Sequence, residues 1–551
     1  MTDLRRSAEQ LGLTENDYVQ YGEGVGKLTP AAAFAEASGD DDAKLPGQLV
    51  LVSAITPTPA GEGKTTISIG LADGLRARGI RSVAALRQPS LGPTLGSKGG
   101  GAGGGNARLE PFERVNLGLT GDLHAIAAAQ NLLVSLVDNA IQFNTAPLDS
   151  RRIDVPRLID LDDRALRDVI TGLGGPLNGT PREGRFDITA AGEVMAILCL
   201  ARDWADLKAR LGRMRVGSSA SGEIVTAAGV GAVGGMAVVL RDALLPNLLQ
   251  TREGTVALVH GGPFANIAHG CSSVVATRFA LGRAEVVVTE GGFGFDLGAE
   301  KFLDIKCRAA GIWPSAVVLV ATLKALKMHG GVAQADAGKP NPTALKEGCG
   351  NLRQHLSTAR TFGLTPVVAL NLFPGDPEDE LRTVEAFVEE QGAVSARASV
   401  YVDGAQGGTA LADKVLAVLK TRRGAKLEPQ YLYPLDLPLK AKIERIAQVV
   451  YGATGVDYSA IAERELAQAE ASGMLNAPVC MAKTHLSLTA DPKKGGKPQP
   501  HVLPIKSIRV SAGAGFVVAL CGEIMTMPGL GKAPAVLQMD LTDAGEIVGL
   551  K

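Results

Sequence analysis

The stretch LVLVSAITPTPAGEGKTT (residues 49–66) decides the fold, because it joins an apolar, β-branched run to a short segment rich in glycine and threonine. Residues 67–79 follow with apolar side chains at Ile67, Leu71 and Leu75, a spacing of four residues that predicts a helix. The order strand, loop, helix puts the loop at a helix N-terminus, where free N–H groups and the helix dipole favour anions. The stretch therefore predicts an α/β protein with a phosphate-binding loop.

The loop supplies the three groups that a P-loop needs. Gly61 and Gly63 let backbone N–H groups point inward, Lys64 carries a positive charge, and the Thr65 hydroxyl is a ligand for Mg²⁺. Thr58 stands where the pattern GxxxxGK[ST] has its first glycine, and we expect the flanking prolines to fix the bend by restricting φ. An ordinary turn of an α/β sheet is the alternative. The expected nucleotide-binding residues are Thr58, Pro59, Ala60, Gly61, Glu62, Gly63, Lys64, Thr65 and Thr66.

Five further apolar runs predict more strands of the same sheet: residues 82–87, 255–260, 285–290, 315–322 and 365–371. Continuous apolar strands separated by helices are typical of a parallel sheet covered on both faces. Such sheets bind ligands at the carboxyl ends of their strands. We therefore expect the chemistry directly after the strands, at Thr56, Arg87, His260, Glu290, Thr322 and Asn371.

The composition indicates a small-molecule enzyme with several domains. The 551 residues are too many for one core, and the net charge of -1 leaves no basic footprint for nucleic acid or an acidic membrane. The six cysteines include no CxxC pair and the N-terminus has no apolar signal segment, so we expect a reduced, cytoplasmic protein. The four glycines of the uncharged residues 224–240 favour a buried, tightly packed loop and helix over a membrane span.

Arg87 is the second candidate cation of the site. It ends a run that we expect to lie next to the strand feeding the loop, so its guanidinium is expected to reach the same site as Lys64. There it would hold a carboxylate or an acyl phosphate through two parallel hydrogen bonds. A surface arginine at a strand end is the alternative.

A glycine run follows Arg87. Seven of the ten residues from Gly96 to Gly105 are glycine, and Lys98 lies among them. A folded enzyme tolerates such a run where its backbone passes close to a ligand or to another segment. A flexible linker is the alternative.

Three other segments carry candidate groups. Asp122 and His124 lie two residues apart, and the two histidines of residues 260–271 are expected to donate hydrogen bonds to an anionic substrate, with a plain loop as the alternative. Glu290 ends its strand where a Walker B carboxylate would lie, although an acid is common there. Phe293 follows on a glycine-rich loop, where an exposed ring stacks on a planar substrate as readily as it fills a core.

Together these segments resemble the formate–tetrahydrofolate ligase family, also called formyltetrahydrofolate synthetase. The resemblance covers nearly the whole chain, and many motifs in one order make it specific. The motifs include TPTPAGEGKTT (56–66), LRQPSLGPT (86–94), GSKGGGAGGG (96–105), LTGDLHAI (119–126), GGPFANIAHGC (261–271), GFGFDLGAEKF (292–302), VATLKALKMHGG (320–331), NLFPGD (371–376) and RVSAGAGF (509–516).

The resemblance implies ATP-dependent ligation of formate to tetrahydrofolate, which gives 10-formyltetrahydrofolate, ADP and phosphate through formyl phosphate. Lys64 would neutralise the transferred phosphoryl group and Thr65 would bind Mg²⁺. Arg87 corresponds to the arginine that holds formyl phosphate, and Asp122 to an aspartate near the substrate pocket. The positions that correspond to the folate pocket are Phe293, Phe373, Pro374 and Tyr401.

Several positions depart from the family pattern. Tyr401 replaces a tryptophan that stacks on folate in many members, and Asp403 replaces a lysine. Asn106 ends the glycine run differently, Gly118 stands where a histidine is common, and Gln88 stands where some members have a glutamate linked to activation by a monovalent cation. The departures leave the ATP site intact and concentrate on the folate side.

The expected architecture is a P-loop NTPase-type parallel sheet domain with two further α/β domains. We expect residues 1–120 and about 285–375 to bind the nucleotide, about 121–284 to form an inserted domain, and about 376–551 to form a C-terminal domain that contributes to the folate pocket. The resemblance implies a homotetramer with ATP, Mg²⁺, tetrahydrofolate and a monovalent cation as ligands. Two alternatives stay open: a divergent ATP-dependent acid ligase with altered folate use, and a P-loop regulatory ATPase.

Overall fold

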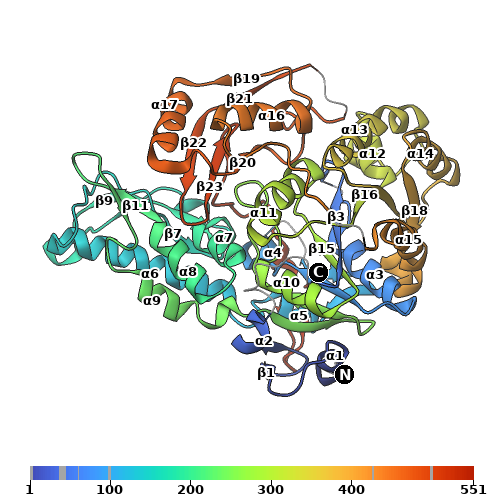
Figure 1. The fold of residues 1–551 in the computed structure, drawn as a ribbon, viewed down its shortest axis with the longest axis horizontal. Coiled ribbons are helices and arrows are strands. Elements are labelled where there is room, and N and C mark those ends of the chain that lie inside the picture. The colour runs from blue at the N-terminus through green and yellow to red at the C-terminus, as the bar shows by residue number, and fades with distance from the viewer. Residues whose placement is uncertain are drawn as a thin grey trace.

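The computed structural model describes residues 4–35, 45–59, 61–96, 101–424, 427–496 and 500–550. Within these ranges the chain is organised around one large sheet (Figure 1). The strands of its main path, in spatial order, are β1 (Tyr18–Gln20), β2 (Gly26–Leu28), β13 (Asn247–Thr251), β14 (Val256–Val259), β4 (Ser82–Leu86), β15 (Val286–Glu290), β3 (Gln48–Ala54), β16 (Ala316–Ala321), β17 (Pro366–Asn371) and β18 (Val394–Ala398). A short hairpin of β5 (Gly103–Gly104) and β6 (Ala107–Glu110) joins β13.

The strands from β14 to β18 run parallel, and the strand expected from residues 49–55 is the central β3. Both faces of β3 are buried: Leu49 and Leu51 belong to one apolar cluster, whereas Val50 and Val52 belong to another. A strand buried on both faces needs a continuous apolar sequence, which is why the run has no polar alternation. The expected parallel α/β sheet is therefore confirmed.

Helices cover both faces of this sheet. Helix α3 (Lys64–Ala77) and helix α15 (Val400–Arg422) share one face and pack closely, because Gly74 and Gly408 meet where a Cβ on Gly74 would lie 2.7 Å from the Gly408 carbonyl carbon. The other face carries α10 (Val274–Arg283), α12 (Leu323–His329) and α13 (Pro342–Thr361), and α16 (Leu439–Tyr451) packs against α13. Helix α14 (Glu378–Glu390) connects the last two strands.

Strand β15 lies between β3 and β4 and pairs with both. The expectation that the strand of Arg87 neighbours the loop-bearing strand is therefore wrong. The chain returns through α10 to place β15 in the gap, a crossover that no local pattern encodes. As a result, Glu290 at the end of β15 lies between the ends of the strands that carry the loop and Arg87.

Two groups of elements flank the sheet (Figure 1). The first contains α6 (Asp122–Phe143), β7 (Arg157–Ile159), β8 (Val169–Thr171), β9 (Arg182–Gly184), β10 (Phe186–Ile188), α7 (Glu193–Leu200), α8 (Trp204–Arg213), β11 (Arg215–Ser218), β12 (Ile224–Thr226) and α9 (Val233–Val239). The second contains α16, β19 (Gly455–Tyr458), α17 (Ala460–Ala469), β20 (Val479–Ala482), β21 (Val502–Ile505), β22 (Ser507–Ser511) and β23 (Phe516–Leu520). The expected domain limits near residues 285 and 375 do not coincide with the edges of the large sheet, since β13, β14 and β18 also belong to it.

Residues 224–240 form β12, a turn and the short helix α9 rather than a tightly packed buried segment. Gly229, Gly231 and Gly234 are exposed, and Val238 is 75% exposed, so the glycines lie mostly on an open face instead of between packed helices. Among the described residues, no helix has both the length and the apolarity that crossing a membrane requires.

Asp73 is a buried acid within helix α3. Its Oδ1 accepts a hydrogen bond from the Thr251 hydroxyl at 2.6 Å, while its Oδ2 is buried without a partner among the described residues. Burial raises the pKa of Asp73 to about 6, which the Thr251 and Thr255 hydroxyls oppose. The charged form is therefore unfavourable in the folded chain.

Asp73→Asn is expected to change how stability depends on pH. The folded chain binds the Asp73 proton more tightly than the unfolded chain, so the free energy of unfolding falls as the pH rises from 3.8 to about 6. The variant lacks this ionisation and should gain on the order of 3 kcal/mol relative to the parent across that interval. Thermal unfolding curves at several pH values measure the gain.

Asp413→Asn provides a control, because the contribution of Asp413 to stability changes with pH in the opposite direction to that of Asp73. Arg78 lowers the pKa of Asp413, so the contribution of this pair is present above the unfolded pKa and is lost as the pH falls. This variant should be slightly less stable than the parent near neutral pH and equal to it in acid. Parallel curves for the parent and Asp73→Asn would contradict the account of a buried acid.

Candidate active site

The loop between β3 and α3 turns at two glycines. Gly61 (φ 75°) and Gly63 (φ 76°) adopt left-handed conformations, and Gly63 caps the N-terminus of α3. A Cβ on Gly63 would lie 2.5 Å from Asn371 Nδ2, which instead donates to the Glu62 carbonyl oxygen at 3.0 Å. Thr58 has no left-handed φ, so this loop does not need a glycine there. Ala60 lies outside the described residues.

Glu62 and Lys64 form the charged centre of the loop. Glu62 Oε1 accepts hydrogen bonds from the Thr58 backbone N–H at 2.7 Å and from the Thr58 hydroxyl at 3.1 Å, and Glu62 Oε2 lies 4.0 Å from Lys64 Nζ. Burial lowers the pKa of Lys64, whereas Glu62 and Glu290 oppose this shift. A bound polyanion would favour the charged ammonium in the same way.

Glu290 joins the loop to Arg87. Its Oε2 accepts a hydrogen bond from the Thr65 hydroxyl at 2.8 Å, and its Oε1 lies 3.4 Å from Arg87 Nε. The guanidinium of Arg87 also contacts the Pro263 carbonyl oxygen at 3.4 Å. The structure thus brings Lys64, Thr65 and Arg87 to one end of the sheet, and Arg87 is close enough for its charge to lower the pKa of Lys64.

The other strand-end residues support this edge from within. The Thr56 backbone N–H donates to Asn351, its hydroxyl contacts the His355 ring, and its carbonyl oxygen contacts the His329 ring. Thr322 caps α12 by accepting the Ala325 N–H. Thr56 and Thr322 therefore use these groups in hydrogen bonds to other parts of the protein.

The histidines of residues 260–271 are not placed to meet a substrate, contrary to expectation. His260 and His269 are both fully buried. The His260 ring is bonded to Ser273 and to the Ala243 carbonyl oxygen at 2.7 Å each. Burial lowers the pKa of His260 to about 4 and that of His269 to about 3, so both rings are neutral at pH 7. The contribution of this loop to the site is the Pro263 carbonyl oxygen.

The three expected aromatic positions have different surroundings. Phe293 (φ 58°) is stacked on His485, with ring centroids 4.4 Å apart and planes inclined by 19°. Lys324 Nζ lies 4.7 Å from the centroid of Phe373, which precedes Pro374 at the end of β17. Tyr401 is 59% exposed and lies against Gly104 and Gly105 of the glycine hairpin. Lys98 of the same run lies outside the described residues.

A family model of formate–tetrahydrofolate ligases matches residues 1–551. The chain belongs to the formate–tetrahydrofolate ligase family. It is 51% identical to the formate–tetrahydrofolate ligase of Myxococcus xanthus over 551 residues, which is 100% of this chain and 98% of that protein. The relatives of the same name from Maricaulis maris and Paracoccus denitrificans are each 50% identical over 548 residues and are covered over 96% and 97% of their lengths.

Asp122 lies in a buried polar network of this ligase-family chain. Its Oδ1 accepts a hydrogen bond from Lys27 Nζ at 2.7 Å, and its Oδ2 accepts one from Asn247 Nδ2 at 2.7 Å. Both members of the ion pair are about 3% exposed. Lys27 precedes Asp122 by 95 residues, so this pairing depends on the tertiary fold and is not encoded in a short stretch of sequence. The expected substrate role of Asp122 stays a prediction.

The positions that depart from the family pattern make local contacts. Asn106 Nδ2 donates to the Val402 carbonyl oxygen at 2.6 Å, and the Asn106 N–H donates to the Tyr401 carbonyl oxygen at 2.9 Å. Asp403 Oδ2 accepts the Ser399 hydroxyl at 2.6 Å. Asn106 and Asp403 therefore fix the segment that carries Tyr401. Gly118 (φ 111°) accepts the Gln88 amide at 3.3 Å, and its conformation suits glycine better than histidine.

Within the described residues, no cluster of three His, Cys, Asp or Glu side chains could hold a metal by itself. A Mg²⁺ ion in this site would need oxygen ligands from a bound nucleotide, which is how Mg²⁺ is usually held in phosphoryl-transfer enzymes. The Thr65 hydroxyl and the Glu290 carboxylate supply one neutral and one charged oxygen beside the loop. The residues present fit an ion that is shared between the protein and phosphates.

Proposed function

We propose that this chain is an ATP-dependent formate–tetrahydrofolate ligase that forms 10-formyltetrahydrofolate through formyl phosphate. One observation carries the proposal: Lys64, Thr65, Glu290 and Arg87 converge at the carboxyl end of the sheet. The β3–α3 loop is then a P-loop, with ATP phosphates at the N-terminus of α3 and Mg²⁺ beside Thr65 and Glu290.

In the first step an oxygen of formate attacks the γ-phosphorus of ATP, and the bond to the bridging oxygen of ADP breaks. The negative charge on the γ-phosphoryl oxygens is matched by Lys64, whose ammonium form is favoured when phosphate replaces solvent around it. Asn371 Nδ2 donates to the Glu62 carbonyl oxygen at 3.0 Å and so satisfies this acceptor of the loop, and the N–H groups at the start of α3 would donate to the phosphates.

In the second step the N10 amine of tetrahydrofolate attacks the formyl carbon. The carbonyl oxygen becomes an oxyanion, and as the tetrahedral adduct collapses the C–O bond to phosphate breaks and the amine proton passes to the leaving phosphate. Arg87 is 25% exposed and is held by Glu290 and Pro263, so its remaining N–H groups are available for the oxyanion and the leaving phosphate.

Folate would be held by Phe293, Phe373, Pro374 and Tyr401. Phe293 is stacked on His485, and its neighbours Gly292 and Gly294 lie against Arg87 and Pro57. Asp122 would act near this pocket through the Lys27 network. Gln88 Oε1 is buried without a partner among the described residues and is a neutral oxygen suited to a monovalent cation. A cytoplasmic homotetramer is the assembly that the family resemblance favours.

The test is an assay with ATP, formate and tetrahydrofolate, each omitted in turn, with formylated folate and ADP measured. We expect product only when all three are present. ADP release that needs formate but is indifferent to folate would favour the divergent acid ligase instead. ADP release without formate would favour a regulatory ATPase.

Tyr401→Trp is expected to lower the Kd for tetrahydrofolate several-fold, because indole offers a larger stacking surface than phenol. The change corresponds to about 0.5–1 kcal/mol of binding free energy. Isothermal titration calorimetry with tetrahydrofolate measures the change. Tyr21→Trp serves as the control, since Tyr21 is 38% exposed near the N-terminus and lies outside the proposed pocket. An unchanged folate affinity in Tyr401→Trp would exclude stacking at this position.

A further inference from the structure

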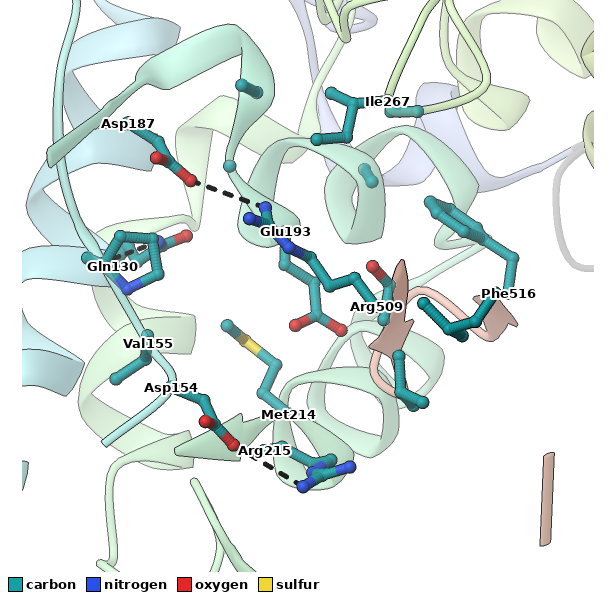
Figure 2. A pocket seen from close by; sticks show the side chains of 18 of the residues that line it. Gln130, Asp154, Val155, Asp187, Glu193, Met214, Arg215, Ile267, Arg509 and Phe516 are labelled. Carbon is teal, nitrogen blue, oxygen red and sulfur yellow. Dashed lines mark hydrogen bonds and ion pairs between the residues drawn. The ribbon is translucent and has the colours of Figure 1, made fainter. Parts of the chain in front are cut away.

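A cavity lies away from the β3–α3 loop, between the elements around α7 and the strands β22 and β23 (Figure 2). It has a volume of about 360 Å³, which suits a small molecule. Three arginines from separate parts of the chain line it: Arg185, Arg215 and Arg509. In the view of Figure 2 the Glu193 carboxylate lies between the Asp187–Arg509 pair and the Asp154–Arg215 pair.

The ion pairs of the three guanidinium groups are long, and Arg185 Nη2 also donates to the Asp154 backbone carbonyl oxygen at 3.0 Å. Arg185 and Arg509 lie 3.9 Å and 3.8 Å from Asp187, and Arg215 lies 3.5 Å from Asp154, all longer than a good charge-assisted hydrogen bond. The Nε atoms of Arg185 and Arg215 are buried and have no hydrogen-bond partner among the described residues. A buried N–H without a partner is costly, so these groups call for an acceptor that the described protein atoms do not provide.

Four carboxylates line the same cavity: Glu193, Asp187 and Glu465 accept hydrogen bonds, and Asp154 lies 3.5 Å from Arg215. Glu193 Oε1 accepts the backbone N–H groups of Gly513 at 2.8 Å and Ala514 at 3.3 Å. Asp187 accepts the Thr526 hydroxyl at 2.7 Å, and Glu465 accepts the Ile508 N–H at 2.7 Å. Burial raises the pKa of Glu193 to about 7, so near neutral pH this side chain opposes an anion only in part. Among the described residues that line the cavity, the buried side-chain atoms without a hydrogen-bond partner are therefore both donors, Arg185 Nε and Arg215 Nε.

We propose that this cavity is a binding site for a small polyanion with carboxylate or phosphate groups, held by Arg185, Arg215 and Arg509. Guanidinium groups recognise both kinds of oxyanion through paired N–H donors. The three guanidinium groups come from separate segments, so a ligand with several oxyanion oxygens could contact more than one of them.

The site is placed to act as an effector site. Ile267 and Ala268 line the cavity, and the same loop presents the Pro263 carbonyl oxygen to Arg87 and the Ala265 carbonyl oxygen to Lys301. A ligand that binds in the cavity and fixes this loop would therefore also change the contact between the Pro263 carbonyl oxygen and Arg87. This consequence rests on the proposed ligase function, whereas the binding itself does not.

Binding is tested by isothermal titration calorimetry on the full chain with two probes, succinate for carboxylates and inorganic phosphate for phosphates. We expect at least one probe to bind with a Kd below about 10 mM, and Arg215→Gln and Arg509→Gln each to weaken that binding at least about tenfold. Arg213→Gln, an exposed arginine two residues before Arg215, should bind like the parent. The probe that binds identifies the ligand chemistry.

Two outcomes overturn the proposal. One is the absence of binding by either probe, which would mean that the arginines serve only the internal ion pairs. The other is equal binding by the parent, Arg215→Gln and Arg509→Gln, which would mean that the anion binds at another site, for example at the β3–α3 loop. Arg215 pairs with Asp154, whereas Arg509 pairs with Asp187. If one variant fails to fold, the other therefore still tests the proposal.

The effector role is tested by turnover with and without the bound probe. We expect the probe to change kcat of the parent at least about twofold and to leave Arg215→Gln unchanged at the same concentration. An equal change in both proteins would overturn the effector role, since the probe would then act at the active site. Absence of ligase turnover in the parent would count against the proposed function and not against binding.

Discussion

Lys64→Ala is expected to lower ligase turnover by on the order of 1,000-fold or more, because no other cation of the β3–α3 loop can meet the charge of the transferred phosphoryl group. Lys64 is the first residue of α3, and its Nζ is 4.0 Å from Glu62. Without the ammonium group, the buried carboxylate of Glu62 would face the phosphates directly. We therefore expect both phosphoryl transfer and ATP affinity to fall.

The measurement is formate-dependent ADP release, followed with and without tetrahydrofolate. The thermal stability of the variant should stay close to that of the parent, since burial disfavours the Lys64 charge in the ligand-free chain. Lys414→Ala, an exposed lysine of α15, makes the same chemical change far from the loop and should retain full activity. Turnover within a few-fold of the parent in Lys64→Ala would remove this residue from the mechanism.

Arg87→Ala is expected to lower turnover on the order of 100-fold or more, as the loss of an oxyanion stabiliser does. The removal also leaves Glu290 without its cation, so this carboxylate would repel the formyl phosphate that Arg87 is proposed to hold. The two effects act in the same direction. We therefore expect a larger loss in kcat than in the affinity for ATP.

Arg87→Lys separates charge from shape, because it keeps a cation beside Glu290 but loses the planar fork. Its turnover should lie between those of the parent and Arg87→Ala. Arg81→Ala is the matched control: Arg81 precedes the same strand, β4, at its opposite end and is exposed. Equal activity of Arg87→Ala and Arg81→Ala would show that the guanidinium at position 87 does not contribute to the reaction.

Much of the fold could be predicted because its signals are local. The expected strand at residues 49–55 and helix at 67–79 correspond to β3 (Gln48–Ala54) and α3 (Lys64–Ala77). The remaining expected runs correspond to β4, β14, β15, β16 and β17. The helix begins earlier than expected, since Gly63 caps it directly and the polar residues at its start carry no apolar period.

The site was predicted less completely, because several of its contacts join distant parts of the chain. Glu290 was expected at the site as a strand-end acid in the place of a Walker B carboxylate, but its hydrogen bond with Thr65, 225 residues away in sequence, is a product of the tertiary fold. His485 carries no motif and was missed, although it stacks on Phe293. The histidines of residues 260–271 were expected to face a substrate, and tertiary packing instead buries them.

By itself, the sequence determined the parallel α/β sheet, the glycine–lysine loop at the start of a helix, and the family, because periodicity, turn residues and motif order are properties of short stretches. The tertiary structure alone decided that β15 lies between β3 and β4, that Glu290 joins Thr65 to Arg87, and that Lys27 neutralises Asp122. It also decided that three arginines from β22, β11 and the segment before β10 share one cavity. These arrangements depend on crossovers and on packing between segments far apart in the chain, which short-range sequence patterns do not encode.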